Sequence, residues 1–233
     1  MTDDKDIQEL LRRKERAITQ MGGLDKIEAQ HKRGRMTARE RVLALLDPGS
    51  FIEFGALAHS ERDEIADRSP ADGKIIGFGT IDGRKVGVGA DDVTVFHASS
   101  SYVGMKKVDR LEKMCFKHGF PFIFLGECGG ARIPDIMTSR GLPRFGVSLD
   151  LMKRNRSVPM ITAILGESFG GSSWYAAVSD FVVQMRGTCL AVSSPRVIEV
   201  ATVPKVTFII RKAYGMAFFS MAGTNSNNDF IYA

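Results

Sequence analysis

The stretch Phe122-Ile-Phe-Leu-Gly-Glu-Cys-Gly-Gly-Ala-Arg-Ile133 decides the fold of this chain. An apolar run with strand character stops at the pair Gly129–Gly130, and residues compatible with a helix follow. A backbone without Cβ atoms can come close to a ligand, and amide N–H groups at a helix start have no intrahelical acceptor. Two such donors aimed at one point would stabilise an oxyanion. We therefore expect chemistry that is carried by main-chain amides.

Two further units repeat this order of strand and glycine. They are Met160-Ile-Thr-Ala-Ile-Leu-Gly-Glu-Ser-Phe-Gly-Gly-Ser-Ser173 and Val206-Thr-Phe-Ile-Ile-Arg-Lys-Ala-Tyr-Gly-Met-Ala217. Upstream, two apolar runs at 74–81 and 84–90 flank Asp82-Gly83, which predicts a β-hairpin. Strands that alternate with helices are typical of the α/β class.

Before Phe122, helices are expected in three places. Helical spacing predicts one from Tyr102 to His118, which Gly119 ends. The segment Thr37–Glu40 fits a capping box that opens a second. The highly charged residues 1–36 allow one amphipathic helix with Gly22-Gly23 as its stop.

Composition restricts the possible ligands. The 233 residues are 44% hydrophobic and 25% charged, which is ordinary for a soluble globular protein. A net charge of +5 suits anionic ligands. The charges are scattered, and we find neither zinc-ligand spacing nor a basic-aromatic stripe. A phosphate-bearing small molecule is therefore favoured over nucleic acid.

The three cysteines (Cys115, Cys128, Cys189) are odd in number and form no CxxC, which favours a reducing compartment and no metal. Cys128 directly precedes the glycine pair, where packing in a tight turn is favoured over a nucleophilic role. The N-terminus is acidic without an apolar core, and no segment approaches the ~18 apolar residues of a membrane span. We expect a cytoplasmic protein without membrane association.

Several stretches together resemble the carboxyltransferase (β) subunit of biotin-dependent acyl-CoA carboxylases, of the propionyl-CoA and acetyl-CoA carboxylase type. They run from about Ala29 to Met221 and comprise Gly34–Phe51, Asp72–Arg84, Gly129–Ile133, Gly170–Gly171 with Ser179–Phe181, and Val203–Val206 with Arg211–Gly215. Each stretch alone is a weak signal, but the set is specific.

The resemblance implies a crotonase-like fold (the ClpP/crotonase spiral of ββα units) and a carboxyl transfer from carboxybiotin to the α-carbon of an acyl-CoA. It implies that Gly129 and Gly130 hold the thioester oxygen, and that Met216 and Ala217 hold the biotin ureido oxygen. The adjoining residues that it assigns to substrate binding are Ala131, Arg132, Gly170, Gly171 and Gly215. It also implies a partner that carries biotin, namely a biotin carboxylase and carrier subunit, and a homo-oligomer.

Two residues depart from the family pattern. Met216 replaces the second glycine after the tyrosine, so a thioether needs space and a positive φ becomes costly. His97 stands in His97–Tyr102, which replaces a glycine-rich stretch. That change could alter acyl selectivity, or His97 could be an ordinary loop residue.

The resemblance also suggests how the chain divides. Residues 1–36 form a charged helical segment, 37–202 the N-terminal carboxyltransferase domain, and 203–233 a fragment of the C-terminal domain. Family members are about twice as long, and the material expected between Thr202 and Val203 is absent. Either the sequence joins segments of a longer polypeptide, or the chain has an internal deletion. We favour the first, because a deletion of that size would expose a large apolar surface.

Two other functions compete with carboxyl transfer. Another crotonase-type acyl-CoA enzyme (a decarboxylase, hydratase or hydrolase) would share the thioester site, and a hydratase would need a carboxylate pair beside it. Glu127 and Glu167 are the candidates, although an acidic residue after a strand is often solvated or a cap. A non-catalytic carboxylase subunit is the remaining possibility.

Overall fold

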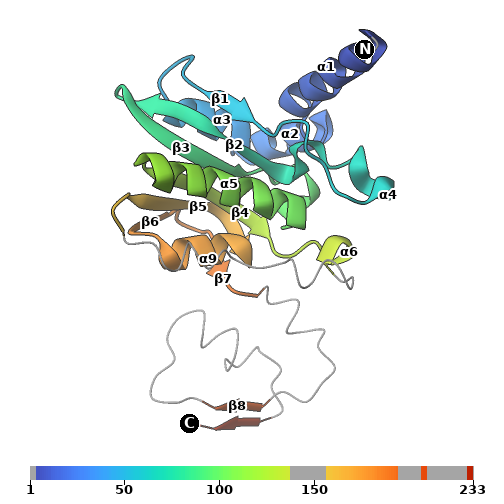
Figure 1. The fold of residues 1–233 in the computed structure, drawn as a ribbon. Helices are drawn as coiled ribbons and strands as arrows, with labels where there is room; N and C mark the ends of the chain where they lie inside the picture. Colours follow the sequence, from blue (N-terminus) through green and yellow to red (C-terminus); the bar gives the residue numbers. More distant parts are fainter. Residues whose placement is uncertain (1–3, 137–155, 194–205, 209–229, 233) are drawn as a thin grey trace.

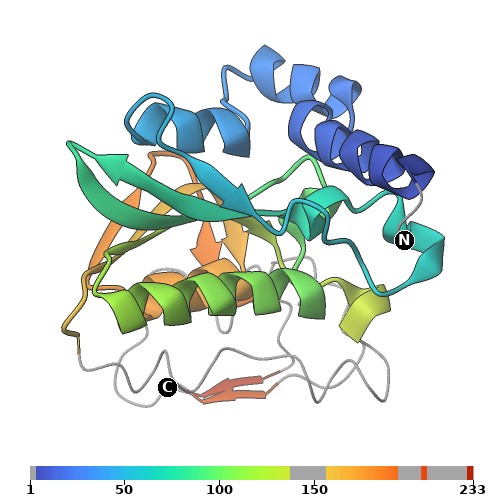
Figure 2. The ribbon, with the colours of Figure 1, turned by 45° about the horizontal axis from the view of Figure 1, so that its top comes forward.

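A mixed sheet with helices on both faces forms the described part of the chain (Figures 1 and 2). This computed structural model describes residues 4–136, 156–193, 206–208 and 230–232. The helices are α1 (Asp4–Thr19), α2 (Leu24–Lys32), α3 (Ala38–Leu45), α4 (Asp63–Ala66), α5 (Tyr102–His118), α6 (Ile133–Ile136) and α9 (Gly171–Val178), with short 3₁₀ turns η1 (Pro70–Gly73) and η2 (Phe96–Ala98). The strands are β1 (Ile52–Phe54), β2 (Lys74–Ile81), β3 (Arg84–Asp91), β4 (Phe122–Gly129), β5 (Met160–Phe169), β6 (Phe181–Gln184), β7 (Leu190–Ala191), β8 (Val206–Phe208) and β9 (Phe230–Tyr232).

The sheet runs in the order β1-β2-β3-β4-β5-β6, with β7 also paired to β5. The first three strands are antiparallel, and β3 to β6 are parallel. Ile81 pairs with Arg84, which confirms the hairpin predicted around Asp82-Gly83. Strands β8 and β9 form a separate parallel pair.

Side-chain alternation along the strands builds two cores. Successive residues of a strand point to opposite faces of a sheet. Ile75 and Ile123 therefore join the core beneath α3, whereas Ile76 and Phe122 join the core beneath α5 and α9. Figure 2 shows α1 to α3 on one face of the sheet and α5 with α9 on the other.

The predicted helix ends at α3 and α5 are confirmed. Glu40 N–H donates to Thr37 Oγ1 at 3.3 Å and Thr37 N–H donates to Glu40 Oε2 at 2.7 Å, which is the capping box. In α5, Ser101 accepts from Gly104 N–H at the start, and Gly119 ends the helix with φ of 74°.

The N-terminal prediction was incomplete, because the described residues 4–36 hold a second helix after the predicted stop at Gly22-Gly23. α1 already ends at Thr19, and α2 begins after Gly22-Gly23. Between them Met21 enters the core with 6% exposure, and Gly22 N–H donates to Thr94 Oγ1 at 3.0 Å. A methyl group on Gly22 would lie 1.9 Å from Thr94 O, so only glycine allows this close approach.

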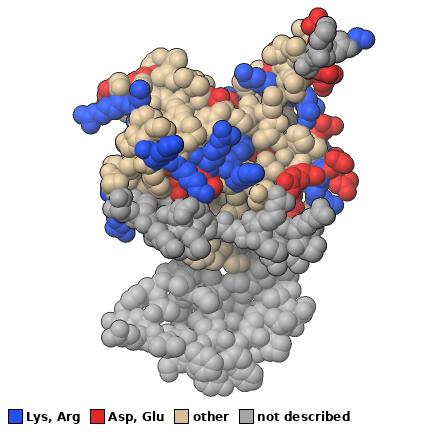
Figure 3. Space-filling view, viewed as in Figure 1, with Lys and Arg blue, Asp and Glu red and all other residues tan. Residues whose placement is uncertain are grey.

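Charge is distributed unevenly over the surface. Lysine and arginine gather over α5, and acidic residues gather near α4 (Figure 3). The exposed cations of α5 are Lys106, Arg110, Lys113 and Lys117. Within the described ranges, the helices are all too short or too polar to cross a bilayer.

Candidate functional site

The two glycine pairs meet at the carboxyl ends of neighbouring strands. β4 and β5 are parallel, and Gly129 pairs with Phe169, so the residues that follow both strands emerge at the same edge. A methyl group on Gly170 would lie 3.6 Å from Gly130 Cα and 4.0 Å from Ala131 N. Two backbones thus pack against each other with no side chain between them.

The chain after Gly129 differs from the helix start that the sequence suggested. Ser100 N–H donates to Gly130 O and Arg132 N–H donates to Ser100 O, both at 2.7 Å, and Ala131 forms a parallel bridge with Ser100. This bridge keeps the chain extended, with Gly130 at φ 105°, until the four-residue α6 begins at Ile133. A helix does follow the glycine pair, but it starts three residues after Gly130 and not at the pair itself.

The helix start lies instead at the second pair. Gly170 takes φ of 65° as the N-cap of α9. Ser173 N–H and Trp174 N–H donate to Gly170 O at 3.1 and 3.2 Å, so the first intrahelical donor is Ser173. The N–H groups of Gly171 and Ser172 precede it and carry the partial positive charge of a helix N-terminus.

The buried Cys128 contacts the backbone of the Gly129–Gly130 pair. Its side chain is buried, and Sγ donates to Ala98 O at 3.2 Å. Gly130 N–H donates to Cys128 Sγ at 3.4 Å. Sulfur is a weak acceptor, so a substrate oxygen would be the better partner for this amide.

A buried carboxylate fixes the two pairs relative to each other. Asp91, at the end of β3, accepts from Lys74 Nζ, from Ser172 Oγ and from Glu127 N–H, the last at 3.1 Å. Burial is the largest single influence on the pKa of Lys74 and acts to lower it, but the charge of Asp91, the Cys128 sulfur and the hydrogen bond to Asp91 together outweigh it, so this pKa is raised. The network joins β2, β3, β4 and α9.

Arg132, a predicted substrate-binding residue, is built into the wall of the site. Its guanidinium pairs with Asp72 and donates to Ser99 O at 3.2 Å, and its side chain is 4% exposed. Asp72 also accepts from Ser101 Oγ and from Gly104 N–H. A ligand phosphate would have to replace Asp72, and substrate binding by Arg132 stays a prediction.

The two candidate carboxylates have different surroundings. Glu127 is buried and pairs with Arg41 at 2.5 Å and with Arg35 at 3.3 Å. Glu167 is exposed. In the described ranges, no group of three or more His, Cys, Asp or Glu residues could hold a metal ion.

The remaining site predictions lie outside the described residues. These are Gly215, Met216 and Ala217, all assigned from the family resemblance. Sequence reasoning also missed the buried ion pairs around the glycines. The signal for them was a charged residue at the end of an apolar strand, as in Asp91, or two residues before one, as in Asp72.

A family model described as the carboxyl transferase domain matches residues 29–202. The chain belongs to this family. The propionyl-CoA carboxylase beta chain of Cereibacter sphaeroides is 36% identical over 211 residues, which are 87% of this chain and 40% of that protein. The propionyl-CoA carboxylase carboxyltransferase subunit of Haloferax mediterranei is 37% identical over 89% of this chain and 41% of that protein. The chain thus spans about two fifths of the length of these carboxyl transferase relatives.

Solved structures of related proteins agree with the fold. Transcarboxylase 12S with methylmalonyl-coenzyme A bound superposes with a TM-score of 0.72 at 32% identity, over 87% of this chain and 39% of that chain. A Pseudomonas malonate decarboxylase hetero-tetramer gives a TM-score of 0.61 at 28% identity, over 70% of this chain and 63% of that chain. The crotonase-like α/β fold expected from the sequence is confirmed.

Proposed function

We propose that the protein is the carboxyltransferase component of a biotin-dependent acyl-CoA carboxylase. It would move a carboxyl group to the α-carbon of an acyl-CoA. The observation that carries the proposal is the meeting of Gly129–Gly130 with Gly170–Gly171 at one sheet edge, inside the family match. The relatives named as propionyl-CoA carboxylase subunits support the same reaction.

The glycine amides would act on the thioester. Loss of the α-proton places negative charge on the thioester oxygen, and preorganised N–H donors stabilise that charge. In this proposal the Gly129–Gly130 segment binds the oxygen, and the N-terminus of α9 adds its positive potential. One such donor contributes about 3–4 kcal/mol to transition-state stabilisation.

Carboxybiotin, delivered on a carrier protein, would supply the carboxyl group. We assign its ureido oxygen to Met216 and Ala217 beside Gly215. These residues lie outside the described part of the chain, so the assignment rests on the family motif alone.

The partners follow from the same proposal. They are an acyl-CoA, a biotin carboxylase and biotin carrier subunit, and further copies of this chain, with a cytoplasmic location and no role for nucleic acid. A related transcarboxylase 12S structure is named as a hexamer assembly. The exposed cations over α5 suit an anionic ligand of this kind (Figure 3).

An acyl-CoA decarboxylase is the second candidate. The malonate decarboxylase structure, of which this chain covers 63%, favours it. A hydratase is less well supported, because Glu127 is paired with two arginines rather than with a second carboxylate.

The test is carboxylation with labelled bicarbonate, ATP and the biotinylated partner, using the full-length protein. We expect label in one of acetyl-, propionyl- or hexanoyl-CoA, and only when the partner is present. Release of label from carboxyl-labelled malonyl-CoA without any biotinylated protein, together with no carboxylation, would favour the decarboxylase instead.

A further inference from the structure

A left-handed turn lies beside the glycine site. Phe96, His97 and Ala98 form η2 with φ angles of 47°, 53° and 51°. Single residues other than glycine adopt this conformation occasionally, but three in succession are rare because Cβ crowds the following carbonyl. Such outliers persist only where the surrounding structure holds them, and they cluster at functional sites.

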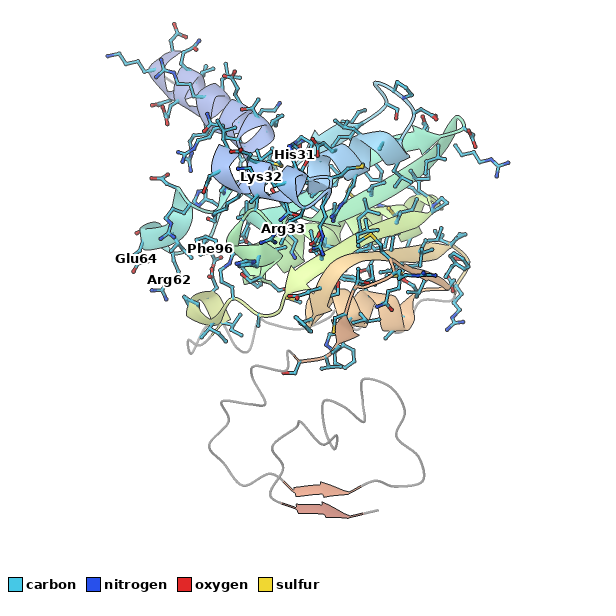
Figure 4. All side chains as sticks on the ribbon, turned by 180° about the vertical axis from the view of Figure 1, so that it is seen from behind. His31, Lys32, Arg33, Arg62, Glu64 and Phe96 are labelled. Atoms are coloured by element: carbon cyan, nitrogen blue, oxygen red, sulfur yellow. The ribbon has the colours of Figure 1, made fainter. Side chains whose placement is uncertain are left out.

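The surroundings hold this turn from both ends. Ala98 is fully buried, and its carbonyl accepts from Lys74 Nζ at 2.8 Å and from Cys128 Sγ at 3.2 Å. The Phe96 ring, labelled in Figure 4, has the guanidinium carbons of Arg68 and Arg132 at 5.3 and 5.1 Å from its centroid. The position of the residue between them is therefore fixed.

That residue, His97, lies directly against Gly129. A methyl group on Gly129 would be 3.1 Å from His97 Cβ and 3.3 Å from His97 O. Beyond the turn, Ser100 bridges Ala131, so the two segments run alongside each other past the glycines. His97 is nevertheless exposed, which places its side chain at the rim of the amide site.

We infer that His97 is a specificity-determining residue that limits the size of the acyl chain. The inference rests on the proposed function. When the thioester oxygen is held at the Gly129–Gly130 amides, the sulfur and the α-carbon both lie within two bonds of that oxygen, because both are bonded to the carbonyl carbon. A ring at the rim then contacts either the sulfur side or the alkyl side. The sulfur side is the same in every acyl-CoA, so only an alkyl contact can select among them.

The experiment compares acetyl-, propionyl- and hexanoyl-CoA in binding titrations and in carboxylation assays of the full-length protein. His97→Gly should raise the hexanoyl-to-acetyl ratio of kcat/KM, and of affinity, by about tenfold or more, since each methylene in a fitted pocket is worth at least that. Glycine adopts φ of 53° without strain, so this variant folds. His97→Phe, which is bulkier, should lower the ratio.

Asp82→Gly is the matched control. Asp82 is exposed in the β2–β3 turn and has φ of 50°, so the substitution relieves the same backbone strain away from the site. Its substrate ratios should equal those of the wild type.

The outcomes separate the two proposals. Unchanged ratios in His97→Gly, or an equal shift for all three acyl-CoAs, would overturn the role of His97 while wild-type carboxylation leaves the function standing. A wild-type protein that binds none of the three thioesters would overturn both.

Discussion

Gly129 has no side chain, and this allows its close contact with His97. Alanine there would place Cβ 3.1 Å from His97 Cβ and 3.3 Å from His97 O, tighter than ordinary contact. We expect Gly129→Ala to fold and to lower kcat/KM for acyl-CoA by about tenfold or more, because small displacements of reacting groups are costly. Steady-state kinetics measures this.

The double variant checks the cause. His97→Gly removes the crowding Cβ, so Gly129→Ala combined with His97→Gly should recover part of the lost rate. Equal losses with and without His97 would contradict the steric explanation. Gly130 is a poorer test site, since its φ of 105° strains any other residue whether or not a ligand binds.

Cys115 should make stability depend on alkaline pH. Burial, and secondarily Glu112, raises the pKa of this thiol from 9.0 to about 12. Between those values the unfolded thiol loses its proton while the folded one keeps it, so the free energy of unfolding falls as pH rises above 9. Between pH 7.5 and pH 10, the free energy of unfolding of the wild type should fall by about 1.4 kcal/mol more than that of Cys115→Ala. Urea unfolding at both pH values measures the difference, and parallel losses would show that Cys115 does not contribute.

At the scale of elements, Glu127 joins α3 to the end of β4. Arg41, on α3, is 10% exposed in its side chain and pairs with Glu127 at 2.5 Å, whereas Arg35 is 35% exposed and pairs at 3.3 Å. Removing one partner of a buried ion pair leaves a charge without compensation. We expect Arg41→Met to lower the free energy of unfolding by roughly 3 kcal/mol.

Arg35→Met is the matched control for this pair. Its greater exposure should limit the loss to below about 1 kcal/mol. Urea unfolding of both variants at pH 7.5 gives the comparison. Equal losses would mean that exposure does not set the strength of these pairs.

Local signals explain which elements could be predicted. The capping box at Thr37, the hairpin turn at Asp82-Gly83 and the stop at Gly119 each depend on neighbouring residues, and all three are confirmed. Gly22-Gly23 marked the break after α1, but the contact of Gly22 with Thr94, 72 residues away, has no signal in the sequence pattern.

The candidate site was predictable only in part, because some of its features depend on residues that are distant in the sequence. Both glycine pairs were visible because each directly follows an apolar strand. The bridge between Ser100 and Ala131, which keeps the chain extended after Gly130, depends on a segment 31 residues upstream of Ala131. The strained turn at His97 likewise becomes visible only once Gly129 lies against it.

For the whole molecule, we propose that residues 203–233 are a unit separate from 37–202. Among the residues whose burial the structure describes, both cores are built from residues before 180, and β8 pairs with β9 in a sheet of their own. The free energy of unfolding of a chain that ends at Thr202 should therefore differ from that of the full chain by less than about 0.5 kcal/mol, as for changes away from packed features. Urea unfolding compares the two, and a truncated chain without a cooperative transition would contradict the boundary.

The shared carboxylate of Asp91 has a consequence for hydrogen exchange. The Asp91 side chain accepts hydrogen bonds from Lys74, Ser172 and the Glu127 amide. If β2, β4 or α9 opened alone, the buried Asp91 carboxylate would lose a hydrogen-bond donor, which is energetically costly. The Glu127 amide should then exchange with deuterium only through global unfolding, together with the strands around it. The backbone that presents the glycines would be the last part of this protein to become mobile.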